Sequence, residues 1–244
     1  LMALSGDERY LFYLAQESAC SGDAAVCDGH SVAVLNLERP DQAPAVVPLP
    51  QNCGPAALLP LGQSHVLATC TNRAVLQMID AGGRTLQTVD LSGYVGLDTD
   101  VPATRRNPIR PQFGFVTPAG EPGVVLADGT LLWQTAAGGV QRLDALPAGL
   151  RAVPGQVAQP DARTLVVPYY TYGASTVEGV KVVDLARREV VRDVPLGGAE
   201  HVVPSGAHLL VLGTDGGVTW VPVTPGGTAQ PAAGVSPAAE VLVP

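Results

Sequence analysis

Apolar and polar positions alternate in short runs along this chain, and one arrangement of them recurs. A proline or small residue and a tight polar turn precede an aliphatic run, as in "PSGAHLLVLG" from Pro204 and "PDARTLVVPY" from Pro160. Turn residues followed by Val- and Leu-rich runs are typical of β-hairpins. The six copies are spaced by 32 to 58 residues and begin at Ser5, Pro60, Pro118, Pro160, Pro204 and Ser236.

A second unit lies between these copies. In 74–91 and 180–197, apolar alternation continues on both sides of a turn that contains Gly or Arg, which predicts an antiparallel strand pair. No long helical periodicity with caps occurs along the chain. The two units together give four strands per repeat, at the period of a propeller blade. We therefore predict an all-β fold, a β-propeller of four-stranded antiparallel blades with little or no helix.

The number of blades follows from counting the two units. The first hairpin occurs six times and the second only five times. Five blades would leave the C-terminal strand to close the ring, whereas six blades would need a strand pair upstream of Leu1. The length of 244 residues fits five blades better than six. We treat 1–244 as one propeller domain, and the abrupt start at Leu1 also fits a fragment or module of a longer chain.

Four cysteines occur, at Cys20, Cys27, Cys53 and Cys70. They form no CxxC pair and lie far from the histidines, which argues against a zinc site. An even number at short separations predicts the disulfides Cys20–Cys27 and Cys53–Cys70 and an extracytoplasmic location, periplasmic, secreted or at the cell surface. If "PLGQ" forms a two-residue turn, Cys53 lies directly opposite Cys70 in the hairpin.

Two stretches resemble known repeats. The run "VVDLARREVVRDVPLGG", followed by "HVVPSGAHLLVL", resembles the YVTN-type bacterial β-propeller repeat, in which an aspartate ends the third strand and a Pro-x-Gly turn precedes the next hairpin. The run "ADGTLLWQTAAGGVQRL" resembles a blade of the quinoprotein-like propellers. The chain lacks the YVTN tetrapeptide and the Trp-Asp dipeptides of WD-type repeats. The resemblance implies envelope or secreted proteins for the first class, and dehydrogenases or non-enzymatic assembly factors for the second.

Composition narrows the function classes. Aromatic residues make up only 5% of the chain, so the core must consist of Val, Leu and Ala. The net charge of −8 argues against nucleic-acid binding, which depends on clustered cations. No apolar run reaches the roughly 18 residues of a transmembrane helix.

The innermost strands of a propeller line its central channel. Counting back from each turn places Gln156, Glu200 and His201 there, among apolar and small residues. Glu200 and His201 are candidates for a metal site or a general base, and the competing interpretation is a solvated loop pair. Too few carboxylates converge for calcium, so we expect no metal and no cofactor.

The longest irregular polar segment is 96–115. Long loops on a rigid scaffold commonly carry binding residues. Arg105, Arg106 and Arg110 could hold a carboxylate or phosphate, or they could pair with Asp98 and Asp100 of the same segment.

Three of the six tyrosines, Tyr169, Tyr170 and Tyr172, lie close together in the sequence and predict an interface. The alternative is that Tyr170 packs between blades while its neighbours cover the hairpin end. Asp80 and Asp184 end third strands at equivalent positions, which favours structural hydrogen bonding for both.

These observations predict a non-catalytic secreted or envelope propeller that acts as a binding or assembly scaffold. Its loops 96–115 and 169–175 would contact a protein or cell-envelope partner. No G-x-S-x-G motif occurs and no catalytic set converges, which disfavours an enzyme. The alternatives are a lactonase-like hydrolase, a quinoprotein-like dehydrogenase, or a structural module of a larger cell-surface protein.

Overall fold

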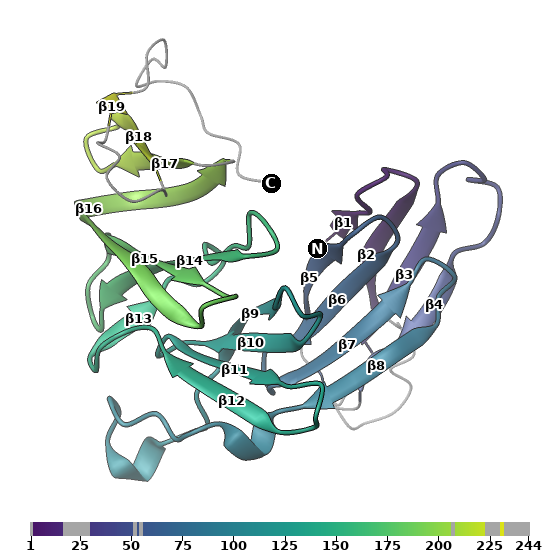
Figure 1. Ribbon diagram of the computed structural model, residues 1–244, viewed down its shortest axis with the longest axis horizontal. Coiled ribbons are helices and arrows are strands. Elements are labelled where there is room, and N and C mark those ends of the chain that lie inside the picture. The colour runs from purple at the N-terminus through teal and green to yellow at the C-terminus, as the bar shows by residue number, and fades with distance from the viewer. Residues whose placement is uncertain are drawn as a thin grey trace, which may run out of the picture. The chain divides into compact units, whose positions relative to one another are not determined.

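The protein is described by a computed structural model covering residues 2–16, 30–50, 53, 56–205, 208–222 and 230–231. Three sheets have four strands each, joined in chain order (Figure 1). The first contains β1 (Met2–Leu4), β2 (Tyr10–Gln16), β3 (His30–Asn36) and β4 (Ala45–Pro48). The second contains β5 (Ala56–Leu61), β6 (His65–Cys70), β7 (Val75–Asp80) and β8 (Thr85–Asp90). The third contains β9 (Pro111–Val116), β10 (Pro122–Leu126), β11 (Thr130–Gln134) and β12 (Val140–Asp144).

The remaining strands form one seven-stranded sheet that corresponds to two blades. Its strands are β13 (Leu150–Ala152), β14 (Thr164–Thr171), β15 (Val177–Asp184), β16 (Glu189–Ser205), β17 (His208–Gly213), β18 (Val218–Pro222) and β19 (Gln230–Pro231). The first part of β16, up to Ala199, pairs with β15, and the part from Ala199 onward pairs with β17. The strand β16 therefore serves as the last strand of a fourth four-stranded group and the first of a fifth. Five groups match the five-blade prediction, and the sixth hairpin copy, from Ser236, lies outside the described residues.

The chain divides into two compact units. The first unit comprises Leu1–Phe115, Glu121–Val125 and Leu132–Gln141, and the second comprises Val116–Gly120, Leu126–Leu131 and Arg142–Pro244. A single domain over 1–244 stays a prediction. The only helical segments among the described residues are two short 3₁₀ turns, η1 (Ser92–Tyr94) and η2 (Ala103–Arg105), which agrees with the predicted scarcity of helix.

Aliphatic side chains fill the interior of each unit, as the low aromatic content requires. In the first unit Val32, Val66 and Ile79 are completely buried around Phe12, because alternate residues of β2, β3, β6 and β7 point inward. In the second unit Val166, Val180 and Leu209 are completely buried in a separate cluster. Strands buried on both faces, such as β6 and β10, read as nearly continuous apolar runs rather than as alternation.

The predicted disulfide Cys53–Cys70 is present, with 5.0 Å between the two Cα atoms. The strand register behind that prediction is wrong. Leu61 pairs with His65 and Ala56 pairs with Cys70, so three residues rather than two form the turn. Cys53 therefore lies before β5 and reaches the end of β6 from outside the strand pairing. The predicted pair Cys20–Cys27 lies outside the described residues.

The segment 96–115 is also more regular than predicted. Its last part, Pro111–Val116, is the strand β9, so the irregular insert ends at Arg110. Within the insert, Leu97 and Pro108 form an isolated antiparallel bridge. The sequence pattern missed this bridge because one bridging pair carries no alternation.

Candidate functional site

The insert after β8 is an ordered hairpin, which we call the 96–109 hairpin. Leu91, which is buried, fixes its base, and the backbone N–H of Leu91 donates to the carbonyl of Ala74 at 2.7 Å. The Asp90 carboxylate then accepts the backbone N–H of Ser92 at 2.9 Å, an arrangement that starts a turn. These contacts attach the base of the insert to the second sheet.

Backbone hydrogen bonds close the two arms of this hairpin. The N–H of Ile109 donates to the carbonyl of Gly96 at 3.0 Å, and the N–H of Asp98 donates to the carbonyl of Asn107 at 2.9 Å. Asn107 and Arg110 each precede a proline, and a residue before proline is restricted to extended conformations. The sequence thus favours an extended returning arm from Arg106 to Arg110.

The exposed residues of the insert include large apolar and cationic side chains. Tyr94 is 57% exposed and Leu97 is 55% exposed, and Pro108 is exposed across the bridge from Leu97. Arg106 and Arg110, which the sequence indicated as candidate binding residues, are exposed as well. Arg105 belongs to η2, and its side chain lies outside the described part of the structure. Sequence reasoning missed Tyr94 and Leu97, whose only signal is that two large apolar residues stand in a polar insert.

Tyr169 is buried, at 9% exposure, and forms part of the interior of its sheet. Its hydroxyl donates to the Asp193 carboxylate at 3.0 Å, and the Lys181 ammonium lies 2.5 Å from that carboxylate and 5.5 Å from the Tyr169 ring centroid. Burial, together with the hydrogen bond to Asp193, raises the pKa of Tyr169 to about 12. The phenol therefore stays protonated and acts as a hydrogen-bond donor.

The cross-strand neighbour of Tyr169 is a glycine for a packing reason. Gly179 pairs with Tyr169 in the strand register, and a Cβ atom at that position would lie 2.3 Å from the tyrosine hydroxyl. The ring lies across this glycine to reach the strand beyond. This contact gives Tyr169 a structural role within its own sheet.

The three tyrosines do not lie on one exposed surface, and an interface at these residues stays a prediction. Tyr170 is half-buried and faces away from Tyr169, because neighbouring residues in a strand point to opposite sides. Tyr172 is 51% exposed, and the guanidinium of Arg151 lies 5.4 Å from its ring centroid. Only Tyr172 of the three offers a large exposed area.

Glu200 and His201 belong to the strand β16 rather than to a loop, and both are exposed. The Gln156 side chain accepts the backbone N–H of Val202 at 2.9 Å. Its amide nitrogen donates to the Glu200 carbonyl at 3.4 Å and lies 3.2 Å from His201 Nδ1. Through these contacts the amide of Gln156 connects the turn after β13 to the strand β16, which is a structural role.

The side-chain amide of Gln159 makes similar contacts with the backbone of Val116. The side chain of Gln159 accepts the backbone N–H of Val116 at 3.0 Å and donates to the Val116 carbonyl at 2.7 Å. It therefore pairs with the end of β9 as a neighbouring strand would. The segment after β13 is therefore hydrogen-bonded to Val202 of β16 through Gln156 and to Val116 of β9 through Gln159.

We expect Gln159→Ala to lower the free energy of unfolding by about 1–3 kcal/mol, because both polar groups of Val116 would lose their partner. Gln159→Glu keeps the acceptor for the Val116 N–H but places a carboxylate oxygen against the Val116 carbonyl, so it should also be destabilising. Urea unfolding of the purified variants measures both. A Gln159→Ala variant as stable as the wild type would mean that water replaces the amide at no cost.

Asp80 and Asp184 have the structural roles that the sequence favoured. The hydrogen bonds from Arg163 to Asp184, at 3.0 Å from Nε to each oxygen, hold the pKa of this carboxyl below its usual range. Asp80 accepts the backbone N–H and the Nε of Arg84, both at 2.8 Å. Asp184 also accepts the backbone N–H groups of Ala186 and Arg187, so both carboxylates close the turns that follow third strands.

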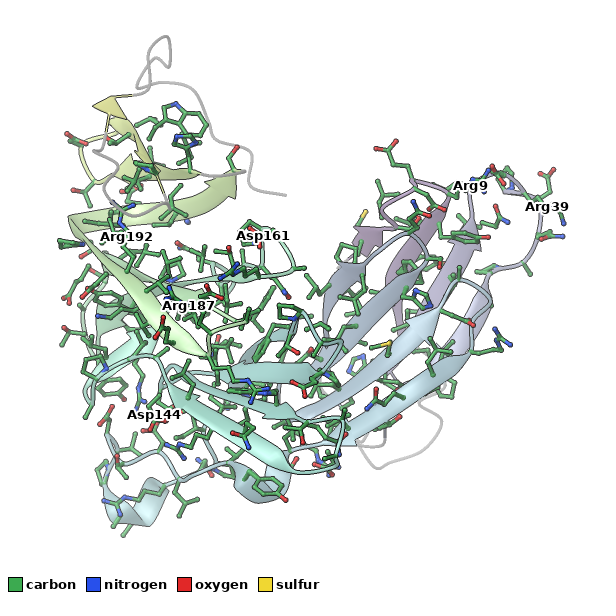
Figure 2. All side chains as sticks on the ribbon, in the orientation of Figure 1. Arg9, Arg39, Asp144, Asp161, Arg187 and Arg192 are labelled. Atoms are coloured by element: carbon green, nitrogen blue, oxygen red, sulfur yellow. A yellow bond between two sulfur atoms is a disulfide. The ribbon has the colours of Figure 1, made fainter. Side chains whose placement is uncertain are left out.

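A groove of about 500 Å³ lies beside β16, β17 and β18, and the sequence did not predict it. Its apolar surface comes from Val194, Leu196, Val211 and Val221, and glycines of the segments 197–198 and 213–217 also line it. Arg192 lines the groove and donates to the carbonyl of Pro222 (Figure 2). The only available signal was the glycine content of "LGG" and "GTDGG".

Among the described residues, no group of three or more His, Cys, Asp or Glu side chains could hold a metal ion. No helix in the described part of the chain is long and apolar enough to span a membrane.

Comparison with known proteins identifies the class of the fold. No protein-family model matches the chain, and no curated protein matches its sequence. A crystal structure of a protein from Lactobacillus plantarum matches with a TM-score of 0.57 and 16% identity, covering 95% of this chain and 69% of that one. The WD40 β-propeller domain of Doa1 matches with a TM-score of 0.55 and 12% identity, covering 90% of this chain and 62% of the other.

The strand topology and these matches together define a β-propeller. At such low identity the likeness concerns the fold alone, because one propeller architecture serves many unrelated functions.

Proposed function

We propose that this chain is a non-catalytic binding or assembly scaffold, secreted or located in the cell envelope, and built from YVTN-like blades. The observation that carries the proposal is the 96–109 hairpin with its neighbour Tyr94. This ordered insert presents Tyr94 and Leu97 to solvent beside Arg106 and Arg110. Large apolar side chains exposed on a rigid protrusion are typical of protein-binding surfaces, where aromatic residues and arginine are enriched.

The polar residues of the other candidate sites support the same proposal. Gln156, Tyr169 and Asp184 have their functional groups engaged in contacts within the fold. The insert, by contrast, keeps large apolar side chains exposed for recognition. Its attachment through buried Leu91 keeps it ordered before binding, which reduces the entropy lost on association.

The proposed extracytoplasmic location rests on the disulfide between Cys53 and Cys70. Disulfides persist in oxidising compartments and are rare in the cytosol. A protein or cell-envelope partner would therefore be encountered outside the cytoplasm.

Site-specific photo-cross-linking in the native cell tests the scaffold function. The full chain would carry benzoylphenylalanine in place of Tyr94, and a matched chain would carry it in place of Leu86, an exposed residue of β8 in the adjoining sheet. We expect one discrete cross-linked protein from position 94 and none from position 86. The same products from both positions, or no product from either, would contradict the proposal.

A further inference from the structure

The returning arm of the 96–109 hairpin presents an alternating face. Residues two apart in an extended strand point to the same side, so Arg106, Pro108 and Arg110 share one face of the arm. Arg106, Pro108 and Arg110 are all exposed; on the other face Ile109 is partly buried and Asn107 is exposed. The Cδ1 atom of Ile109 lies near Gly96 on the opposite arm, 3.8 Å from where a Cβ would be.

Leu97 adds apolar area to the middle of this face. It bridges to Pro108 across the hairpin, and directly opposed residues of a strand pair project to the same side. The result is a small apolar centre, Leu97 with Pro108, between two arginines. Arg110 follows Arg106 by four positions, which corresponds to about 13 Å in an extended chain.

We infer that this face binds an extended acidic protein segment in which one apolar side chain lies between two carboxylates. The inference rests on the proposed scaffold function and names the chemistry of its partner. Guanidinium groups bind carboxylates through paired, charge-assisted hydrogen bonds, and an arginine presents this geometry better than a lysine does. A ligand with carboxylates four residues apart in an extended chain has the spacing of the two arginines.

The charge distribution favours binding of an acidic ligand at the face formed by Arg106, Pro108 and Arg110. The chain has a net charge of −8, so most of its surface repels an acidic segment, and two neighbouring exposed arginines are an exception. The acidic residues of the insert stand on the other arm, where Asp98 accepts the backbone N–H of Asp100 at 3.1 Å. An acidic partner is therefore directed to the returning arm, and its binding should weaken as salt screens the charges.

A fluorescent peptide with the core Glu-Ser-Leu-Ser-Glu tests the inference by anisotropy against the full chain. We expect saturable binding that weakens with added salt, and at least about tenfold weaker binding to the double variant Arg106→Ala and Arg110→Ala. The matched control is the double variant Arg39→Ala and Arg187→Ala, which removes the same charge from two other turns (Figure 2) and should bind as the wild type does.

Further variants separate charge from apolar contact. Leu97→Ser should weaken binding of the acidic peptide while leaving its salt dependence unchanged. The double variant Arg106→Glu and Arg110→Glu should lose the acidic peptide and bind a Lys-Ser-Leu-Ser-Lys peptide instead. Thermal unfolding of each variant checks that the fold is retained, which surface positions permit.

Three outcomes would overturn the inference. They are equal binding of a Gln-Ser-Leu-Ser-Gln peptide, equal loss in the Arg39 and Arg187 control, and no binding of the acidic peptide. If position 94 still cross-links to a partner while the acidic peptide fails to bind, the scaffold function stands and the acidic chemistry is wrong. If both experiments fail, the scaffold function fails as well.

Discussion

A Gly129→Ala variant is expected to unfold with a free energy about 2–5 kcal/mol below that of the wild type. Gly129 lies in the turn between β10 and β11 with a φ of +77°, a conformation in which a side chain is strained. A steric clash adds to this backbone strain. A Cβ atom there would lie 2.2 Å from Cγ and 2.6 Å from Cβ of Leu146, which is buried.

The backbone around Gly129 cannot move aside easily. Its N–H donates to the carbonyl of Leu126 at 2.9 Å, and its carbonyl accepts the N–H of Ala145 at 3.1 Å. The added methyl group must therefore displace Leu146 from its buried position. Overpacking of this kind adds about 1–3 kcal/mol to the cost of the backbone strain.

Gly138 provides the matched control for this prediction. Its φ is +83°, close to that of Gly129, and an added Cβ would meet nothing within 4 Å. Gly138→Ala should therefore cost only the backbone strain, about 1–2 kcal/mol. Chemical denaturation of the two variants under one condition measures the difference. Equal losses of stability would show that Leu146 relaxes without cost.

Removal of the disulfide between Cys53 and Cys70 should be the second large effect. The bond joins residues 17 apart in sequence, and both cysteines are buried. A closed loop of this length restricts the unfolded chain enough to contribute about 3 kcal/mol. The double variant Cys53→Ala and Cys70→Ala should lose approximately that much free energy of unfolding.

A reductant titration isolates this bond when Cys20 and Cys27 are first replaced by alanine. In that background, dithiothreitol acts only on the pair Cys53 and Cys70, and it should lower stability as far as the alanine replacements do. The quadruple alanine variant should not respond to the reductant. A response of equal size in that variant would assign the effect to something other than the disulfide.

The disulfide also shows where local sequence patterns lose accuracy. The cysteine spacing predicted the pair correctly, but several hairpin registers can bring the two cysteines close enough to bond. The structure uses a three-residue turn, in which Gly62 has a φ of +56° and Leu61 pairs with His65. A turn such as "PLGQSH" admits more than one loop length, and packing of the strands on both sides selects among them.

For some candidate site residues the sequence indicated the exposure, and for others it did not. Exposure of Arg106 and Arg110 followed from a polar segment rich in proline, because such a segment cannot enter the core. The burial of Tyr169 and the exposure of Tyr172 did not follow, since both stand in one run of tyrosines. Strand alternation separates neighbours by face, but only contacts with Asp193 and Lys181 on other strands decide which tyrosine is buried.

By itself, the sequence determined the strand-and-turn repeat, the nearly complete absence of helix, the aliphatic interior and the Cys53–Cys70 pair. These features depend on residues near one another in the chain, where periodicity and turn chemistry act directly. The side-chain hydrogen bonds of Gln156 and Gln159, and the apolar centre formed by Leu97 and Pro108, depend on the tertiary structure alone. These hydrogen bonds connect residues more than 40 positions apart, and the apolar centre requires a hairpin register that no local pattern specifies.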